Sequence, residues 1–76
     1  MRLTIIPSDG TVICNGISKI KLDLTQAEIP LNIHAFQWYN NFGEIEYVNN
    51  LNNKPQNEKV ENLPEWANNC IDIFNS

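Results

Sequence analysis

Two Asx-Gly dipeptides, Asp9-Gly10 and Asn15-Gly16, divide the N-terminal part of the sequence into short β-prone segments. A two-residue type I′ turn needs positive φ at both central positions, which Asn, Asp and Gly adopt at little cost. Aliphatic and β-branched residues flank both dipeptides, and this combination is a strong local signal for a β-hairpin. The pattern therefore predicts consecutive antiparallel strands within residues 2–24, at 3–6, 11–14 and 17–24.

A second hairpin is predicted at 33–48, where strands at 33–39 and 44–48 flank a turn at 40–43. The returning strand carries Glu44 and Glu46 on its outer face, because side chains alternate between the two faces of a strand. The same alternation divides the first strand into a face with His34, Phe36 and Trp38 and a face with Ile33, Ala35, Gln37 and Tyr39.

The C-terminal segment 64–74 predicts an α-helix. Pro64 suits the first turn, where its missing N–H costs nothing, and Glu65 suits the positive end of the helix dipole. A helix of about 11 residues is marginal alone, so its apolar side must dock on the sheet. The polar residues 49–57 predict a loop, and 58–61 a short edge segment. The apolar stripe comprises Leu63, Trp66, Ala67, Cys70, Ile73 and Phe74.

These elements define a single α+β domain over residues 1–76. We expect a small antiparallel β-meander of about five strands with one C-terminal α-helix packed on the sheet. A chain of this size buries about 60% of the surface that its unfolded form exposes, enough for one two-layer core. Such a core leaves no room for a separate catalytic domain.

The charge of the chain excludes several kinds of partner. Five Lys and Arg against nine Asp and Glu give a net charge of −4, whereas phosphate neutralisation needs a clustered cationic face. No apolar run approaches the ~20 residues of a membrane span. The few residues before Pro7 are too short for a signal-peptide core. We therefore expect neither a nucleic-acid nor a membrane partner.

The candidate binding residues lie in the second hairpin. Trp38 and Tyr39 are adjacent, so they point to opposite faces and cannot both enter one thin core. Trp and Tyr supply large, rigid contact area and are enriched at binding hot spots. Three roles are open for these aromatic residues: a sheet that simply has two faces with Tyr39 partly exposed to solvent, an exposed patch for a partner chain, or stacking on a base-containing ligand. The candidates are Trp38, Tyr39, Phe42 and Tyr47, with His34 beside them.

Catalytic and metal-binding patterns are weak. The single histidine, His34, is expected to be packed beside aromatic residues, with ligand contact or catalysis as alternatives. No CxxC or HxxxH spacing occurs, so we expect no metal and no cofactor. Glu44 and Glu46 form either a solvated outer face or an acid pair. An enzyme that combines His34 with one of them is the weakest reading, and we expect no enzyme.

The two cysteines permit one disulfide, between Cys14 and Cys70. Such a crosslink closes a long loop and would contribute ~3–4 kcal/mol. The apparent lack of a signal peptide favours a reducing compartment, where both would be small buried thiols. We therefore expect free thiols.

The sequence also resembles a group of short proteins encoded by tailed bacteriophages and prophages. The resemblance spans almost the whole chain, while Cys14 and the Asn-rich segment 49–53 depart from it. It implies a phage origin, and it assigns neither an activity nor functional residues. The motifs that carry it are the opening MRLTIIPSDGTV, the segment NIHAFQW at 32–38, GEIEY at 43–47 and LPEWA at 63–67.

Together these features predict a small, phage-encoded, non-enzymatic binding protein in the host cytoplasm or the virion. The leading expectation is a virion or tail-associated accessory component that acts through protein–protein contacts, as a homo-oligomer or with a phage or host protein. The alternative is an anti-defence protein that inhibits a host immune component or sequesters a nucleotide second messenger. For nucleotide capture, the candidate residues are Trp38, Tyr39 and Phe42 for stacking, with Arg2, Lys19 or Lys21 for phosphate.

Overall fold

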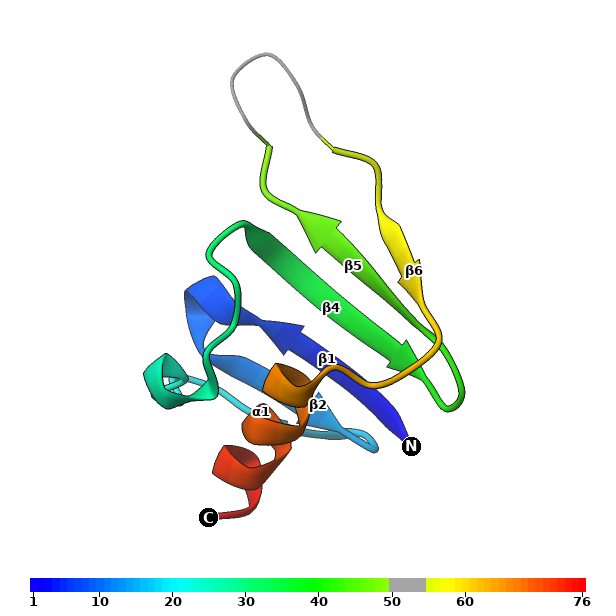
Figure 1. Cartoon of the computed structure of the whole chain (residues 1–76). Helices are drawn as coiled ribbons and strands as arrows, with labels where there is room; N and C mark the ends of the chain where they lie inside the picture. The colour runs from blue at the N-terminus through cyan, green and yellow to red at the C-terminus, as the bar shows by residue number, and fades with distance from the viewer. Residues whose placement is uncertain (50–54) are drawn as a thin grey trace.

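The computed structural model describes residues 1–49 and 55–76. It confirms the α+β class, with six strands in place of about five, all antiparallel, and one C-terminal helix (Figure 1). Most of the predicted 49–57 loop lies outside the described residues. The elements are β1 (Arg2–Ile6), β2 (Thr11–Cys14), β3 (Ile17–Lys19), β4 (Ile33–Tyr39), β5 (Gly43–Tyr47), β6 (Glu58–Val60) and α1 (Glu65–Asn75), with 3-10 turns η1 (Pro7–Asp9) and η2 (Thr25–Ala27).

The sheet consists of two three-stranded meanders placed side by side. The strand order is β3-β2-β1-β4-β5-β6, so the first and fourth strands of the chain form its centre. The register there pairs Arg2 with Tyr39, Thr4 with Gln37 and Ile5 with Phe36. The centre of the sheet is thus a long-range pairing, whereas each half is built from strands that follow one another in sequence.

The β1–β2 hairpin forms as predicted, but its loop is longer than a two-residue turn. Pro7–Asp9 make a 3-10 turn, and Gly10 alone takes the left-handed conformation, with φ 63°. The second turn has the predicted geometry. Asn15 and Gly16 both have positive φ, at 50° and 84°, and join β2 directly to β3.

The prediction that the third strand reaches residue 24 is wrong, because β3 ends at Lys19. Lys21 takes the left-handed conformation with φ 57°, which breaks the extended backbone. The next amide, that of Leu22, then donates to the Gly10 carbonyl at 2.9 Å. Leu22 and Leu24 nevertheless pack against the core, because this segment turns back beside the β1–β2 loop.

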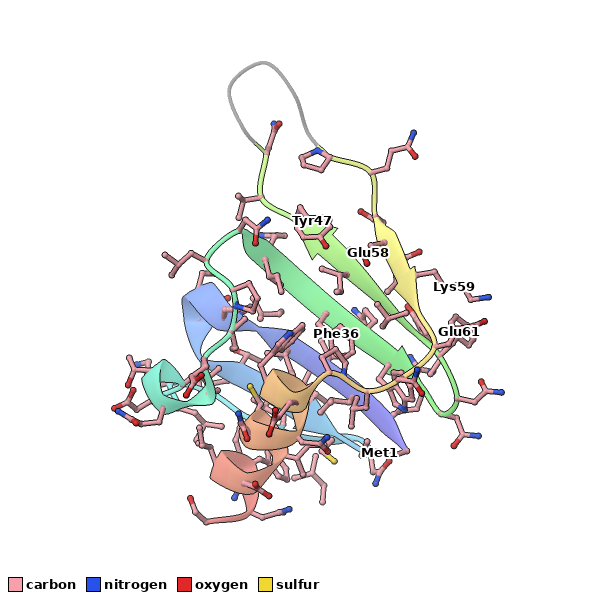
Figure 2. All side chains as sticks on the ribbon, viewed as in Figure 1. Met1, Phe36, Tyr47, Glu58, Lys59 and Glu61 are labelled. Atoms are coloured by element: carbon pink, nitrogen blue, oxygen red, sulfur yellow. The ribbon has the colours of Figure 1, made fainter. Side chains whose placement is uncertain are left out.

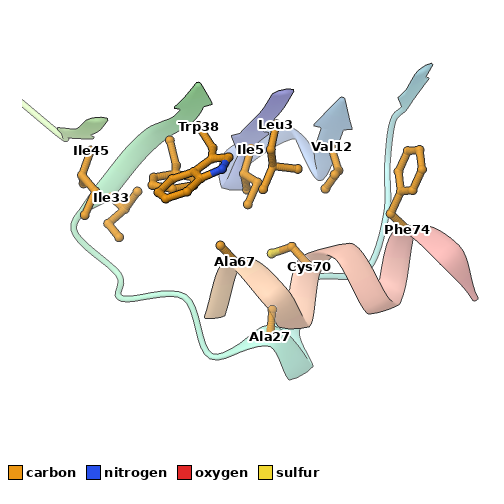
Figure 3. Packing of buried hydrophobic residues seen from close by; sticks show 11 residues of the cluster. Leu3, Ile5, Val12, Ala27, Ile33, Trp38, Ile45, Ala67, Cys70 and Phe74 are labelled. Atoms are coloured by element: carbon orange, nitrogen blue, oxygen red, sulfur yellow. The ribbon is translucent and has the colours of Figure 1, made fainter. Parts of the chain in front are cut away.

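One face of the sheet and the helix enclose the hydrophobic core (Figure 3). The helix lies at 65–75, one residue later than predicted, with Pro64 as its N-cap. Its predicted apolar stripe is confirmed: Ala67, Cys70 and Phe74 are buried, and the other members pack against them. The buried residues are Leu3, Ile5, Val12, Ala27, Ile33, Phe36, Trp38, Ile45, Ala67, Cys70 and Phe74.

Two polar contacts hold the helix to segments distant in sequence. The Asn69 amide group donates to the Ala27 carbonyl in η2 at 3.1 Å. Lys19 Nζ donates to the Phe74 carbonyl at 2.6 Å and lies 4.7 Å from the centroid of the Phe74 ring. A cation in this position also faces the negative end of the helix dipole. Among the described residues, no helix has the length and apolar character needed to cross a membrane.

Candidate functional site

The sheet face opposite the helix is the candidate site, and we call it the open face. Alternation along β1 sends Leu3 and Ile5 into the core, where they are 1% and 0% exposed, and sends the residues between them to the other side. None of these outward residues in the central strands is buried. The open face of the two central strands comprises Arg2, Thr4 and Ile6 from β1 and Ala35, Gln37 and Tyr39 from β4.

An aromatic–cation row crosses one end of the open face. The Arg2 guanidinium lies 4.7 Å from the centroid of the Tyr39 ring. That ring is 5.2 Å from the ring of Phe42, with a 30° tilt between them. Lys59 Nζ in turn lies 5.1 Å from the Phe42 centroid. We define the aromatic–cation row as these four residues: two rings in contact with each other and one cation at each end.

The row is held in place by the ends of its strands. Arg2 and Tyr39 are direct cross-strand partners, and the Tyr39 amide donates to the Phe42 carbonyl at 2.7 Å across the β4–β5 turn. The N-terminal ammonium of Met1 donates to Asn40 Oδ1 at 2.9 Å, beside the same turn. The rings therefore lie on a fixed backbone frame and not on a long loop.

Along β1 and β4, neighbouring side chains of the open face form pairs, which we call levels; two more levels follow that of Arg2 and Tyr39. In the middle, Thr4 Oγ1 donates to Gln37 Oε1 at 2.8 Å. At the far end lie two apolar side chains, Ile6 and Ala35, both partly exposed. The central strands thus present three chemically different levels: a cation with a ring, a hydroxyl with an amide, and an aliphatic pair.

Trp38 does not belong to this site, so its selection as a surface binding residue is wrong. It points from β4 into the core, where it is 7% exposed and its ring lies 6.5 Å from that of Phe36. The sequence argument correctly placed Trp38 and Tyr39 on opposite faces. It could not tell on which face of the sheet the helix docks, and that choice decides whether Trp38 or Tyr39 is buried.

His34 is exposed, so the predicted packed histidine is wrong. The register of β4 and β5 shifts between Ile33 and Ala35, which makes His34 the extra residue of a β-bulge. A bulge residue is left out of the ladder, and the alternation restarts after it. Ile33 is consequently buried on the same side of the sheet as Phe36. Simple alternation had placed these two residues on opposite faces.

Tyr47 lies at the other end of β5 from the aromatic–cation row. Its hydroxyl donates to Glu58 Oε1 of β6, and the two side chains meet between these strands (Figure 2). This hydrogen bond raises the pKa of Tyr47, and the nearby negative charge of Glu58 adds to the effect. Of the candidate binding residues, the structure therefore brings together only Tyr39 and Phe42.

The residues proposed for nucleotide capture do not converge. Trp38 is in the core, Lys19 binds the C-terminal carbonyl of the helix, and Lys21 lies in a hollow with Asp9 and Asp23 beside η1. Arg2 alone of the three cations joins Tyr39 and Phe42. Of the residues proposed for nucleotide capture, the described part of the chain therefore places only Arg2, Tyr39 and Phe42 together.

Lys59 is the member of the site that the sequence argument missed. It pairs with Glu44 on the open face of β6, and Figure 2 shows its side chain pointing away from the strand. The segment 58–61 was expected to form an edge strand, and alternation there would have placed Lys59 opposite Glu58. Its contact with Phe42, however, depends on the register between β5 and β6. The sequence does not determine this register, because a long segment joins the two strands.

The remaining reactive groups are separated. Within residues 1–49 and 55–76, no cluster of three or more His, Cys, Asp and Glu residues could hold a metal ion. No disulfide joins the two cysteines in the structure: Cys70 is buried, whereas Cys14, expected to be buried as well, is only partly buried. Burial raises the pKa of the Cys70 thiol to about 11, so this thiol stays protonated and unreactive at neutral pH.

Comparisons of the chain with protein-family models, with curated proteins and with solved structures find no match. The fold and the open face therefore carry the functional argument.

The hydrogen bond between Tyr47 and Glu58 makes a testable prediction about pH. In a Tyr39→Phe variant, the remaining tyrosine should ionise above its ordinary pKa of 10.0, as followed by phenolate absorbance. Because the folded-state pKa is raised, the stabilisation is complete below the unfolded pKa and is lost as pH rises through the folded pKa. Adding Glu58→Gln should lower the midpoint, and an unchanged midpoint would exclude Glu58 as the cause.

Proposed function

We propose that the protein is a non-enzymatic protein-binding module whose binding surface is the open face. The observation that carries this proposal is the aromatic–cation row. Tyr and Arg are among the residues that contribute most to protein interfaces, because they combine large contact area with hydrogen bonding. Here Tyr39 and Arg2 stand side by side on an uncovered sheet, with Phe42 and Lys59 continuing the surface.

The mutual contacts within the aromatic–cation row also favour binding, because they restrain its side chains. Each ring has a cation about 5 Å from its centroid, and the two rings contact each other. Side chains that already restrain one another in the free protein lose less conformational entropy when a partner covers them. The open face is therefore preorganised for contact with a fairly flat partner surface.

The setting of this activity follows from the resemblance to phage-encoded proteins. We place the protein in the virion or in the cytoplasm of the bacterial host, as an accessory component that acts by contact with another protein chain. Inhibition of a host defence component through the same face is the alternative within this class. The open face is the functional surface in either case.

Site-specific photocrosslinking tests the proposed function. Tyr39 is replaced by p-benzoylphenylalanine, which keeps an aromatic side chain, in the full chain expressed in bacterial cells. We expect a discrete protein adduct after irradiation. The control places the same group at Asp72, which is exposed on the helix, and should give no such adduct. Equal adducts at both positions, or none at Tyr39, would contradict the proposal.

A further inference from the structure

We infer that the chain carries a second binding site, a groove for a peptide segment of a partner protein that combines aliphatic side chains with Lys or Arg. The groove lies where the loop between β1 and β2 meets the segment 20–32, which joins β3 to β4. Two hollows of about 530 and 270 Å³ adjoin there, and the larger is within the size range of ligand sites, about 300–1,000 Å³. None of the described residues that line them belongs to the open face. We call the two hollows together the loop groove; both are lined by Pro7, Ser8, Ile29 and Leu31.

The floor of the loop groove is aliphatic. Leu22, Leu24 and Ile29 line the larger hollow and also pack against the hydrophobic core, so their positions are fixed from behind. Leu31 lines both hollows and is 100% exposed. A single exposed leucine is ordinary on a protein surface, but this one adjoins apolar side chains and joins the two hollows into one apolar surface. A partner that covers Leu31 would therefore extend an apolar contact that the groove already offers.

The two hollows differ in charge, which gives the loop groove a direction. The larger hollow is lined by three carboxylates and one cation, Lys21, so it carries a net negative charge; the carboxylates are those of Asp9, Asp23 and Glu28. Hydrogen bonds from the Thr25 hydroxyl and amide, at 2.6 and 3.1 Å, lower the pKa of Asp23 and keep it ionised at neutral pH. The smaller hollow has no carboxylate among its described lining residues. It is formed mainly by aliphatic and proline side chains: Pro7, Ile29, Pro30, Leu31, Ile33 and Val48.

This polarity matches a basic, partly aliphatic peptide segment. A Lys or Arg side chain can lay its methylene stem along apolar surface while its charge reaches carboxylates, as the larger hollow requires. An aliphatic side chain suits the smaller hollow. An extended peptide, unlike a compact small molecule, can place one side chain in each. The acidic rim opposes phosphate-bearing ligands, and the net charge of −4 also favours encounter with a basic partner.

One wall of the loop groove is held in an unusual backbone conformation. Lys21 and Glu28 have left-handed φ values of 57° and 63°, which residues other than Gly and Asn rarely adopt. Backbone hydrogen bonds fix this wall: the Lys21 amide donates to the Asp9 carbonyl at 3.2 Å, and the Leu22 amide to the Gly10 carbonyl at 2.9 Å. Such conformations persist only where the surrounding structure holds them, and they cluster at ligand-binding sites. A wall that is already ordered also loses less entropy when a peptide binds.

An NMR titration of the full, nitrogen-15-labelled chain tests the inference. The probe is a tetrapeptide with blocked ends, two leucines followed by two arginines, and a second peptide replaces both arginines with glutamates. We expect saturable shifts of backbone amides in the ranges 7–10 and 20–34, while the amides of Thr4 and Gln37 on the open face stay unchanged. The glutamate peptide should bind at least about tenfold more weakly, because like charges meet at the rim.

Two exposed residues of the loop groove provide variants that should leave the fold intact. Leu31→Gln removes the leucine between the hollows and should weaken binding of the arginine peptide about tenfold. Glu28→Gln removes one rim charge and should weaken binding about two- to fivefold. The matched controls are Ile17→Gln, at an aliphatic side chain that is 62% exposed on β3, and Glu61→Gln, at an exposed position after β6. Both controls should bind the peptide as the wild-type chain does.

Four results would overturn this inference: no saturable shift with the arginine peptide, equal binding of the glutamate peptide, shifts centred on the open face, or losses in the control variants equal to those at Leu31 and Glu28. The proposed function is tested separately, because the photocrosslinker at Tyr39 lies outside the loop groove. Peptide binding in the groove without a Tyr39 adduct contradicts only the proposed function. A Tyr39 adduct without peptide binding in the groove overturns only this inference.

Discussion

Replacing Phe36 with alanine is expected to lower the free energy of unfolding by about 3–5 kcal/mol, the range for removal of a buried aromatic side chain. Phe36 is fully buried at the centre of the sheet. Its ring lies 5.0 Å from that of Trp66 in an edge arrangement and also contacts Trp38. The substitution therefore removes packing between the sheet and the helix at one point. Urea denaturation followed by tryptophan fluorescence measures the loss.

Phe42→Ala is the matched control, because it deletes the same atoms from a ring that is 37% exposed. It should change the free energy of unfolding by less than about 1 kcal/mol. Phe36→Leu retains apolar volume and should cost less than Phe36→Ala, which provides a measurable value if the alanine variant does not fold. Equal losses at positions 36 and 42 would show that Phe36 is not a central core residue.

Gly10→Ala is expected to destabilise the protein by about 2–5 kcal/mol, the sum of two effects. A left-handed conformation costs a non-glycine residue ~1–2 kcal/mol, and Gly10 has φ 63°. In addition, an added Cβ would lie 2.8 Å from the Leu22 amide nitrogen and closer still to its carbonyl oxygen. Overpacking of this kind costs about 1–3 kcal/mol, and here the crowding atoms are backbone. The midpoint of thermal unfolding should fall accordingly.

Gly16→Ala separates these two effects. Gly16 also has positive φ, at 84°, but an added Cβ there meets no atom within 4 Å. Only the conformational cost of about 1–2 kcal/mol should remain. If both variants lose the same stability, the contact between the η1 turn and the Leu22 segment is not a constraint on the fold.

The open face could be predicted only in part from the sequence. Alternation correctly separated Trp38 from Tyr39, and composition identified the second hairpin as the aromatic part of the chain. Neither argument could bring Arg2 beside Tyr39, since that contact depends on the pairing of β1 with β4. The bulge at His34 could not be predicted either, because it appears only as a shift in the register between β4 and β5.

Local patterns determined the elements of this protein. The Asn15-Gly16 turn, the two hairpins and the apolar stripe of the helix follow from backbone preference and periodicity, which act over a few residues. The tertiary structure decided how the elements combine: β1 joined the two meanders, the helix docked on one face, and that choice buried Trp38 and left Tyr39 with Arg2. Such choices depend on long-range pairing and on the total apolar surface buried, which no short segment of the sequence contains.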